Sequence, residues 1–280
     1  MCTMEFIEQQ LIKFKKMIED AIREGGTDKK ASVIRSSKLI NLIHDAVKYE
    51  LIQNGVEPEQ IFPHFEKTKP EIKLAGYLKL KDQDICVQPI NIEKSKRTID
   101  WGPLAFQHLE DRYGHEYSEN TLVINVRSQM SSLAKNLDTL FERTFAEALN
   151  LHMQYHNMVM GEVYMIPARE YDAKAVKEKK VKFIERQVDV EKYISLFNAI
   201  NNRKIGEPNY KYERCALLIV DFSPKTPKLF RTSEELKKAG LVSKEFQTEY
   251  STLSFDTFAK DILNIYKDRY NIENILKKKK

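Results

Sequence analysis

The sequence contains few of the residues that cross-link or interrupt a chain. Its three cysteines, Cys2, Cys86 and Cys215, are odd in number and far apart, so neither a zinc ribbon nor a disulfide framework is expected. Nine Gly and nine Pro are too few for a loop-rich sandwich or a low-complexity chain. No apolar run approaches the roughly 20 residues that span a bilayer, and no apolar segment follows Met1 as in a signal peptide. We therefore expect a cytoplasmic protein with no membrane partner.

Common catalytic motifs are missing as well. The chain has no P-loop, no GxGxxG fingerprint after a strand, no GxSxG elbow, no HExxH and no kinase motif set. What is present is a soluble composition, with 42% hydrophobic and 31% charged residues and a net charge of +5. Residues 171–280 carry 24 Lys and Arg against 16 Asp and Glu, which leaves a small acidic surplus in residues 1–170. This basic surplus is compatible with a nucleic-acid partner but does not by itself identify one.

Helical periodicity dominates the start of the chain. Apolar spacing predicts a helix over residues 4–24, which the Gly25–Gly26 pair should end. A second helix is expected over residues 32–53, with Glu50 near its C-terminus. These helices precede the first residues with strand character.

The next part of the chain is predicted to be extended. Residues 71–80 and 83–88 have strand character and are separated by a plausible turn at Lys81–Asp82. A polar excursion over residues 91–121 follows, with some helix expected around 103–112.

The strongest pattern is a strand, a long helix and a second strand, predicted over residues 122–127, 131–152 and 158–166. Such a crossover unit places its two strands side by side and parallel. Residues 215–222 indicate a further buried strand, and the remaining helices are expected over 189–200, 233–239 and 255–267. The order predicts one α/β domain, in which helices cover both faces of a mixed sheet.

The polar residues on two of these strands are the candidates for chemistry. Asp84 is followed by apolar residues, and a carboxylate buried there is costly unless it is paired or binds a cation. Asn125, Arg127 and Gln129 share one face of an otherwise apolar strand, and buried polar groups require partners. If the two strands are neighbours, Asp84 faces Asn125 and Arg127. The alternatives are a solvated aspartate at a strand start and a purely structural Asp84–Arg127 pair.

An aspartate on one strand, two polar residues at i and i+2 on the next, a long helix and another strand resemble the core of the PD-(D/E)xK nucleases. Many type II restriction endonucleases share this core. The resemblance covers about residues 32–166 and is carried by Val123–Gln129, which runs into residues 131–136. It implies Mg²⁺-dependent hydrolysis of double-stranded DNA by a homodimer. It also implies that residues of about 171–280 contact the DNA or the second subunit.

The sequence departs from the family pattern at two positions. The pattern has an acid, any residue and then a lysine, whereas Asn125 and Arg127 stand at these places. Asn brings no charge, and Arg remains protonated, so it can stabilise a phosphate but is a poor base. The missing carboxylate could be Glu50, Glu71 or Glu162.

The place of the lysine is also open. Gln129 takes it if the frame is shifted by two residues, and Lys135 could reach back from the following helix. Mg²⁺ needs only one or two carboxylates because it keeps several waters. Asp84 as a metal ligand and Arg127 as a phosphate contact would therefore meet the needs of phosphodiester hydrolysis.

Contacts with DNA are expected from two polar stretches, for which a solvated loop is the alternative. Lys94 and Arg97 lie close to Trp101 and mix charge with an aromatic ring. Arginine and asparagine side chains can read base edges with paired hydrogen bonds. The second stretch comprises Asn201, Asn202, Arg203 and Lys204.

Three hypotheses follow for the function. The first is a Mg²⁺-dependent endonuclease of the restriction type. The second is a non-catalytic nucleic-acid-binding or regulatory protein that keeps the fold with a degraded site. The third is an enzyme of unrelated chemistry, in which Asp84 and Arg127 have only a structural role.

Overall fold

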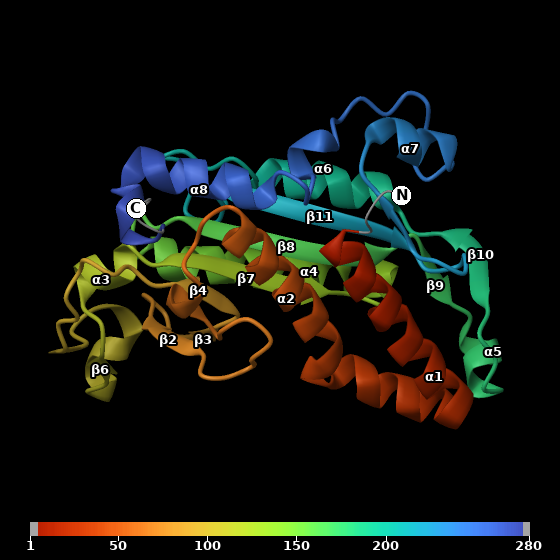
Figure 1. The fold of residues 1–280 in the computed structure, drawn as a ribbon, viewed down its shortest axis with the longest axis horizontal. Coiled ribbons are helices and arrows are strands. Elements are labelled where there is room, and N and C mark those ends of the chain that lie inside the picture. The colour runs from red at the N-terminus through yellow and green to blue at the C-terminus, as the bar shows by residue number, and fades with distance from the viewer. Residues whose placement is uncertain (1–4, 277–280) are drawn as a thin grey trace.

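A computed structural model describes residues 5–276 and contains a six-stranded central sheet (Figure 1). Its strands, in spatial order, are β1 (Ile61–Phe62), β4 (Ile85–Val87), β7 (Leu122–Ser128), β8 (Met160–Pro167), β11 (Arg214–Asp221) and β12 (Lys228–Phe230). The three long strands β7, β8 and β11 are parallel, whereas the pairs β1–β4, β4–β7 and β11–β12 are antiparallel. The predicted α/β class with a mixed sheet is confirmed.

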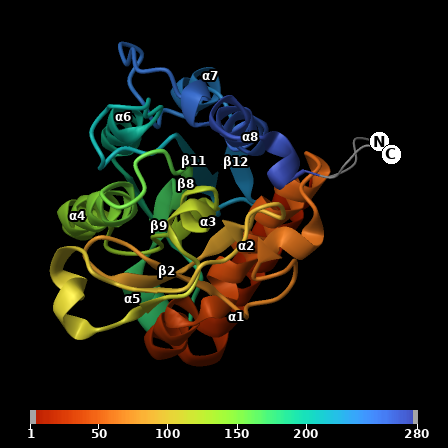
Figure 2. The ribbon, with the colours of Figure 1, turned by 90° about the vertical axis from the view of Figure 1, so that its left-hand side faces the viewer.

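Helices cover both faces of this sheet, as predicted (Figure 2). On one face lie α1 (Phe6–Arg35), α2 (Ser37–Gln53) and α8 (Phe258–Arg269), and on the other lie α4 (Leu133–His152) and α6 (Val190–Ile200). The alternation of side chains along β7 explains this arrangement. Ile124 packs into the apolar core beneath α1, α2 and α8, whereas Val123 packs into the core beneath α4 and α6.

The crossover β7–α4–β8 has the predicted form. Val123 of β7 is paired with Met160 of β8, and the register continues in parallel to Ser128 and Met165. Asn125 and Glu162 are therefore direct neighbours on adjacent strands. This register brings together polar side chains from two parts of the sequence.

The Gly25–Gly26 pair interrupts the first helix, as predicted, but a second helical segment follows directly. Gly26 has φ +60° and ψ −133°, and α1 continues past this kink to Arg35. A Cβ atom on Gly26 would lie 2.8 Å from the carbonyl oxygen of Val176, so glycine allows both the backbone angle and the close approach. Residues 32–35 consequently belong to α1, and α2 begins only after Ser36.

The segment predicted as one strand over 71–80 is a hairpin. It forms β2 (Ile72–Ala75) and β3 (Leu80–Gln83), which pair antiparallel. The turn lies between them and not at Lys81–Asp82, because Asn150 of α4 accepts hydrogen bonds there from the backbone N–H groups of Leu78 and Lys79. Lys81 is thus a strand residue.

The remaining elements are short. The helix expected around 103–112 is a 3₁₀ helix, η2 (Gly102–Gln107). The others are η1 (Pro58–Gln60), β5 (Arg97–Thr98), β6 (Glu110–Asp111), α3 (His115–Glu119), β9 (Arg169–Tyr171), α5 (Ala173–Lys177), β10 (Phe183–Gln187), α7 (Ser233–Lys238), η3 (Ser251–Leu253) and η4 (Ile272–Asn274). Within residues 5–276, no helix combines the length and the apolar character needed to cross a membrane.

Candidate functional site

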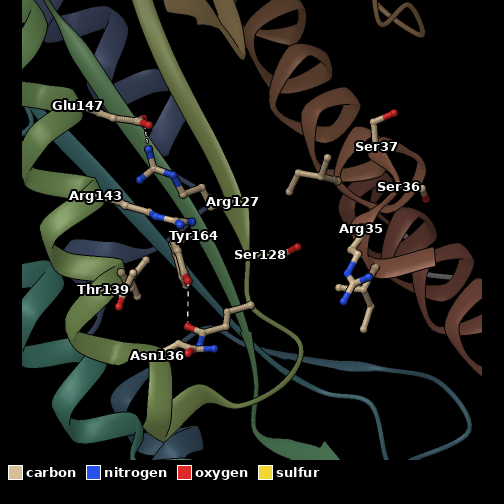
Figure 3. Close-up of a pocket in the computed structure, with 14 residues that line it drawn as sticks. Arg35, Ser36, Ser37, Arg127, Ser128, Asn136, Thr139, Arg143, Glu147 and Tyr164 are labelled. Carbon is tan, nitrogen blue, oxygen red and sulfur yellow. Dashed lines mark hydrogen bonds and ion pairs between the residues drawn. The ribbon is translucent and has the colours of Figure 1, made fainter. Parts of the chain in front are cut away.

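A groove crosses the carboxyl end of β7. Its larger part is a cavity of about 660 Å³ between the α1–α2 junction and α4. Figure 3 shows Arg35 on one side, Arg143 and Glu147 on the α4 side, and Arg127 between them. No carboxylate among the described residues lies within ion-pair distance of Arg35 or Arg143, and both arginines are exposed. The groove therefore offers two free positive charges.

A second cavity of about 330 Å³ adjoins the first. The two share Ser37 and Ile40 as lining residues. The second cavity is lined by Asp84, Glu71 and His44. Two of the predicted metal-ligand candidates, Asp84 and Glu71, therefore open into the same space.

Asp84 lies just before β4 and not within it. Its Oδ2 accepts a hydrogen bond of 2.9 Å from the backbone N–H of Val126, which ties the carboxylate to the end of β7. No donor among the described residues bonds to its second oxygen. Nearby, burial lowers the pKa of His44 although Asp84 opposes this shift, and the buried Nε2 of His44 lacks a hydrogen-bond partner among residues 5–276.

Arg127 is the centre of a partly buried charge cluster. It donates to Oε1 of Glu162 at 2.9 Å and to Oγ1 of Thr144 at 3.1 Å, and it also contacts the carboxylate of Glu147. Burial alone would lower the pKa of Arg127, but Glu162, Tyr212 and Glu147 outweigh burial and raise it. Arg127 is therefore a permanent cation, as expected from its side-chain type.

Glu162 lies at the buried end of this cluster. Its side chain is fully buried, and its Oε2 has no hydrogen-bond partner in the described part of the chain. Burial raises the pKa of Glu162 to about 7, although Arg127 works in the opposite direction. The predicted metal ligand Glu162 thus faces Arg127 in the interior and does not line either cavity of the groove.

Lys81 reaches the cluster from β3. Its Nζ contacts Oε2 of Glu147 and lies within 3.5 Å of Oδ1 of Asn125. Burial would raise the pKa of Glu147, but Arg127 and Lys81 overcome that effect and lower it. Glu147 is consequently an ionised carboxylate at the wall of the groove.

Asn125 of β7 and Gln129, just beyond β7, are occupied by structural hydrogen bonds. Asn125 is fully buried and donates to the hydroxyl of Tyr212 at 3.4 Å. Gln129 lines the groove, but its Oε1 accepts from Tyr164 at 3.1 Å and from Tyr193 at 3.2 Å. A tyrosine-bound Gln129 provides no cation, so it does not take the place of the missing lysine.

Glu50 is not part of this site. It lies thirteen residues beyond Ser37 along α2, about 20 Å from the groove end of that helix. Burial, Glu5 and Asp256 raise its pKa, which shows that its neighbours belong to another region. The prediction that Glu50 supplies the missing carboxylate is wrong.

The polar excursion over residues 91–121 lies at the end of the sheet opposite the groove. Figure 1 shows β6, which belongs to this excursion, far from α5. Arg97 is 3.3 Å from the buried carboxylate of Asp111 and stacks on Trp101, and Lys94 lies over the ring of Tyr117. Arg97 is thus largely occupied by structural contacts, which corrects its expected role in DNA contact, whereas the Lys94 side chain stays exposed.

The second predicted DNA-contacting stretch is partly internal. Arg203 is buried and donates to Glu213 at 2.9 Å, and the buried Asn201 accepts from the backbone N–H of Cys215. Because their polar atoms hold the fold together, the expectation that these two residues read base edges is wrong. Asn202 and Lys204 are exposed, and the exposed Lys135 lies in the first turn of α4 beside the groove.

Sequence reasoning missed three charged residues that line the groove, Arg35, Arg143 and Glu147, and it missed Lys81, which contacts Glu147. One signal was present in α4, where Thr144 and Glu147 interrupt the apolar stripe formed by Leu140, Ala148 and Leu151. Lys81 gave no comparable signal, because Lys81–Asp82 is also a typical turn sequence.

The groove can bind an anion, and carboxylate oxygens that could bind a cation lie beside it. Arg35, Arg127 and Arg143 can hold phosphate oxygens with charge-assisted hydrogen bonds. Asp84 and Glu71 offer carboxylate oxygens in the adjoining cavity. Within residues 5–276, no three His, Cys, Asp or Glu side chains are grouped so that they could hold a metal ion by themselves.

Comparison of the chain with protein-family models, with curated proteins and with solved structures finds no match.

Proposed function

We propose that the protein is a Mg²⁺-dependent DNA endonuclease of the restriction type, which hydrolyses phosphodiester bonds in double-stranded DNA. The observation that carries this proposal is the groove at the end of β7. There, the cavity that holds the carboxylates of Asp84 and Glu71 adjoins the cavity lined by Arg127, Arg35 and Arg143, and the last two arginines have no carboxylate partner within residues 5–276. A hydrolase of a polyanion needs these two kinds of group next to one another.

The groove offers the small number of protein ligands that Mg²⁺ needs. Mg²⁺ takes oxygen ligands and is commonly held by one or two carboxylates, with waters and substrate phosphate completing the octahedron. Asp84 has one oxygen that accepts from no donor within residues 5–276, and Glu71 lines the same open cavity, where it pairs with the exposed Lys69. Asp84 and Glu71 would hold the ion, which activates water and neutralises charge on the phosphate when it is bound.

The protein's own residues would then position the substrate. Arg35 and Arg143 would contact phosphates on the two sides of the groove, and Arg127 would lie near the phosphate to be cleaved. Because Glu162 and Thr144 hold the guanidinium of Arg127, its position is set before the substrate arrives. Two copies of the chain would address the two strands of a duplex, so we include a homodimer in the proposal.

A non-catalytic nucleic-acid-binding protein is the second candidate. It is favoured by the ion pairs of the central cluster, in which Arg127 and Lys81 already occupy the carboxylate of Glu147. The two candidates share the groove as a binding surface and differ only in hydrolysis.

Incubation of the purified protein with long duplex DNA separates these candidates. Discrete fragments that form with Mg²⁺ and not with EDTA support the endonuclease. A salt-sensitive gel shift without fragments supports the non-catalytic protein. Absence of binding to any DNA at low salt would contradict both.

A further inference from the structure

Two positively charged side chains from different parts of the fold contact the same oxygen atom. Nη2 of Arg127 on β7 and Nζ of Lys81 on β3 both contact Oε2 of Glu147, which α4 carries at the groove wall. The side chains of Arg127, Lys81 and Glu147 are 20%, 21% and 17% exposed, and Arg127 and Glu147 also line the larger cavity of the groove.

A phosphate oxygen can take the place of that carboxylate oxygen. Both are anionic acceptors, and lysine and arginine bind both with short charge-assisted hydrogen bonds. We propose that Lys81 and Arg127 form a phosphate clamp, and that Glu147 fills this clamp until a phosphate of the DNA backbone displaces its carboxylate. The inference rests on the proposed function, because it assigns a substrate contact within the same groove.

The clamp keeps its shape when Glu147 leaves. Arg127 retains its ion pair with Glu162 at 2.9 Å and its hydrogen bond to Thr144, and both partners are fully buried. Lys81 retains the amide oxygen of Asn125, which is also buried. Both positively charged side chains are therefore held in place by buried groups that do not contact a ligand in the groove.

Glu147 differs from Glu162 in the freedom to move. Glu147 extends from a helix into the groove on a side chain with several rotamers, whereas Glu162 is enclosed on β8. Burial keeps the pKa of Glu162 high, whereas the two cations keep Glu147 ionised. Glu147 is consequently the carboxylate that competes with an incoming phosphate.

Binding of a 30-base-pair duplex in EDTA at low salt tests the clamp without cleavage. Glu147→Gln removes the competing charge and should tighten binding about tenfold, whereas Lys81→Met should weaken it about tenfold. Glu142→Gln, on the exposed side of the same helix, and Lys73→Met, on the same hairpin, should each change binding less than twofold.

Several results would overturn the inference. Weaker or unchanged DNA binding by Glu147→Gln would show that the carboxylate of Glu147 does not compete with phosphate. An equal gain in affinity for Glu142→Gln would show that the gain comes from the change in net charge alone. If Lys81→Met fails to fold, Lys81→Arg should fold and bind within threefold of the wild type, and a larger loss would also count against the clamp. If the wild type binds no DNA, the proposed function fails and the clamp fails with it. If the wild type binds but Lys81→Met binds equally well, the clamp alone fails.

Discussion

Arg127 and Glu162 form an ion pair across the two central strands, with Nη1 and Oε1 2.9 Å apart and the Glu162 side chain fully buried. This pair joins the fold to the candidate site, because the same guanidinium also contacts Glu147 at the groove. A buried pair is costly to break from one side, since the remaining charge loses its partner.

Arg127→Met should therefore destabilise the protein by about 3–5 kcal/mol. Urea denaturation followed by circular dichroism measures this change. Arg112→Met, at an exposed arginine, serves as the control and should change the free energy of unfolding by about 0.5 kcal/mol or less. Combining Arg127→Met with Glu162→Gln should recover part of the loss, and strict additivity of the two substitutions would contradict the pairing.

Glu162 should make the free energy of unfolding depend on pH. Its pKa is about 7 in the folded state against an ordinary value of 4.5, so the folded state binds this proton more tightly than the unfolded state. The contribution of Glu162 is fully present below pH 4.5 and is lost as the pH rises through about 7, by at most about 3 kcal/mol. Denaturation curves at pH 5, 6, 7 and 8 should show this fall in the wild type, and Glu162→Gln should lack it. Parallel curves for the two proteins would assign the slope to another group.

Asp84→Asn should separate binding from hydrolysis. The amide oxygen of asparagine can still accept the hydrogen bond from the N–H of Val126, so the end of β7 stays in place while the charge is lost. Cleavage of long duplex DNA in Mg²⁺ should fall more than about 100-fold, because Mg²⁺ loses an anionic ligand. The gel shift should remain within twofold of the wild type, and Asp100→Asn, at an exposed aspartate, should cleave normally. Unchanged cleavage by Asp84→Asn would remove Asp84 from the site.

The two unpaired arginines of the groove should set the salt dependence of DNA binding. Each phosphate contact contributes a slope of about −0.9 to the plot of log affinity against log salt. Arg35→Gln combined with Arg143→Gln should make the slope less steep by about 2. Binding titrations between 50 and 200 mM salt measure it. Arg112→Gln, which lies before β7 at the other end of the sheet, should leave the slope unchanged. The same slope in all three proteins would place DNA elsewhere on the surface.

Gly161 should tolerate no side chain. A Cβ atom there would lie 2.7 Å from Cδ1 of Ile262 and 2.7 Å from Cζ of Phe258, which hold α8 against the sheet. Gly161→Ala should therefore lower the free energy of unfolding by about 1–3 kcal/mol through overpacking. Thermal denaturation detects the change, and Phe258→Leu introduced beside it should cost less than it does alone. A melting temperature equal to that of the wild type would show that α8 shifts freely.

The parts of the fold that follow a regular apolar pattern could be predicted from the sequence. β7, α4 and β8 were predicted within two residues of each boundary, because side-chain periodicity and burial agree there. The continuation of α1 beyond Gly26 and the hairpin turn before β3 were not predicted. Both depend on distant partners, the carbonyl of Val176 and the side chain of Asn150, and these contacts have no local signature.

The same distinction applies to the candidate site. The prediction that Asp84 faces Asn125 and Arg127 depended on the two strands being neighbours. β4 and β7 are neighbours, and the carboxylate of Asp84 accepts a hydrogen bond from the backbone N–H of Val126, between these two residues. The choice among Glu50, Glu71 and Glu162 could not be made, because it depends on which end of each element faces the groove. Asn201 and Arg203 resemble surface recognition residues by type, but their partners Cys215 and Glu213 lie in the interior.

The position of α8 has a consequence for biosynthesis. Residues 258–269 cover the face of the sheet on which Gly161 lies, so α8 cannot cover this face until the ribosome has made these residues. The parallel strands β7, β8 and β11 are complete long before that point, and an uncovered apolar sheet is prone to aggregate. Until α8 has been made, the nascent protein therefore depends on α1 and α2 to shield this face.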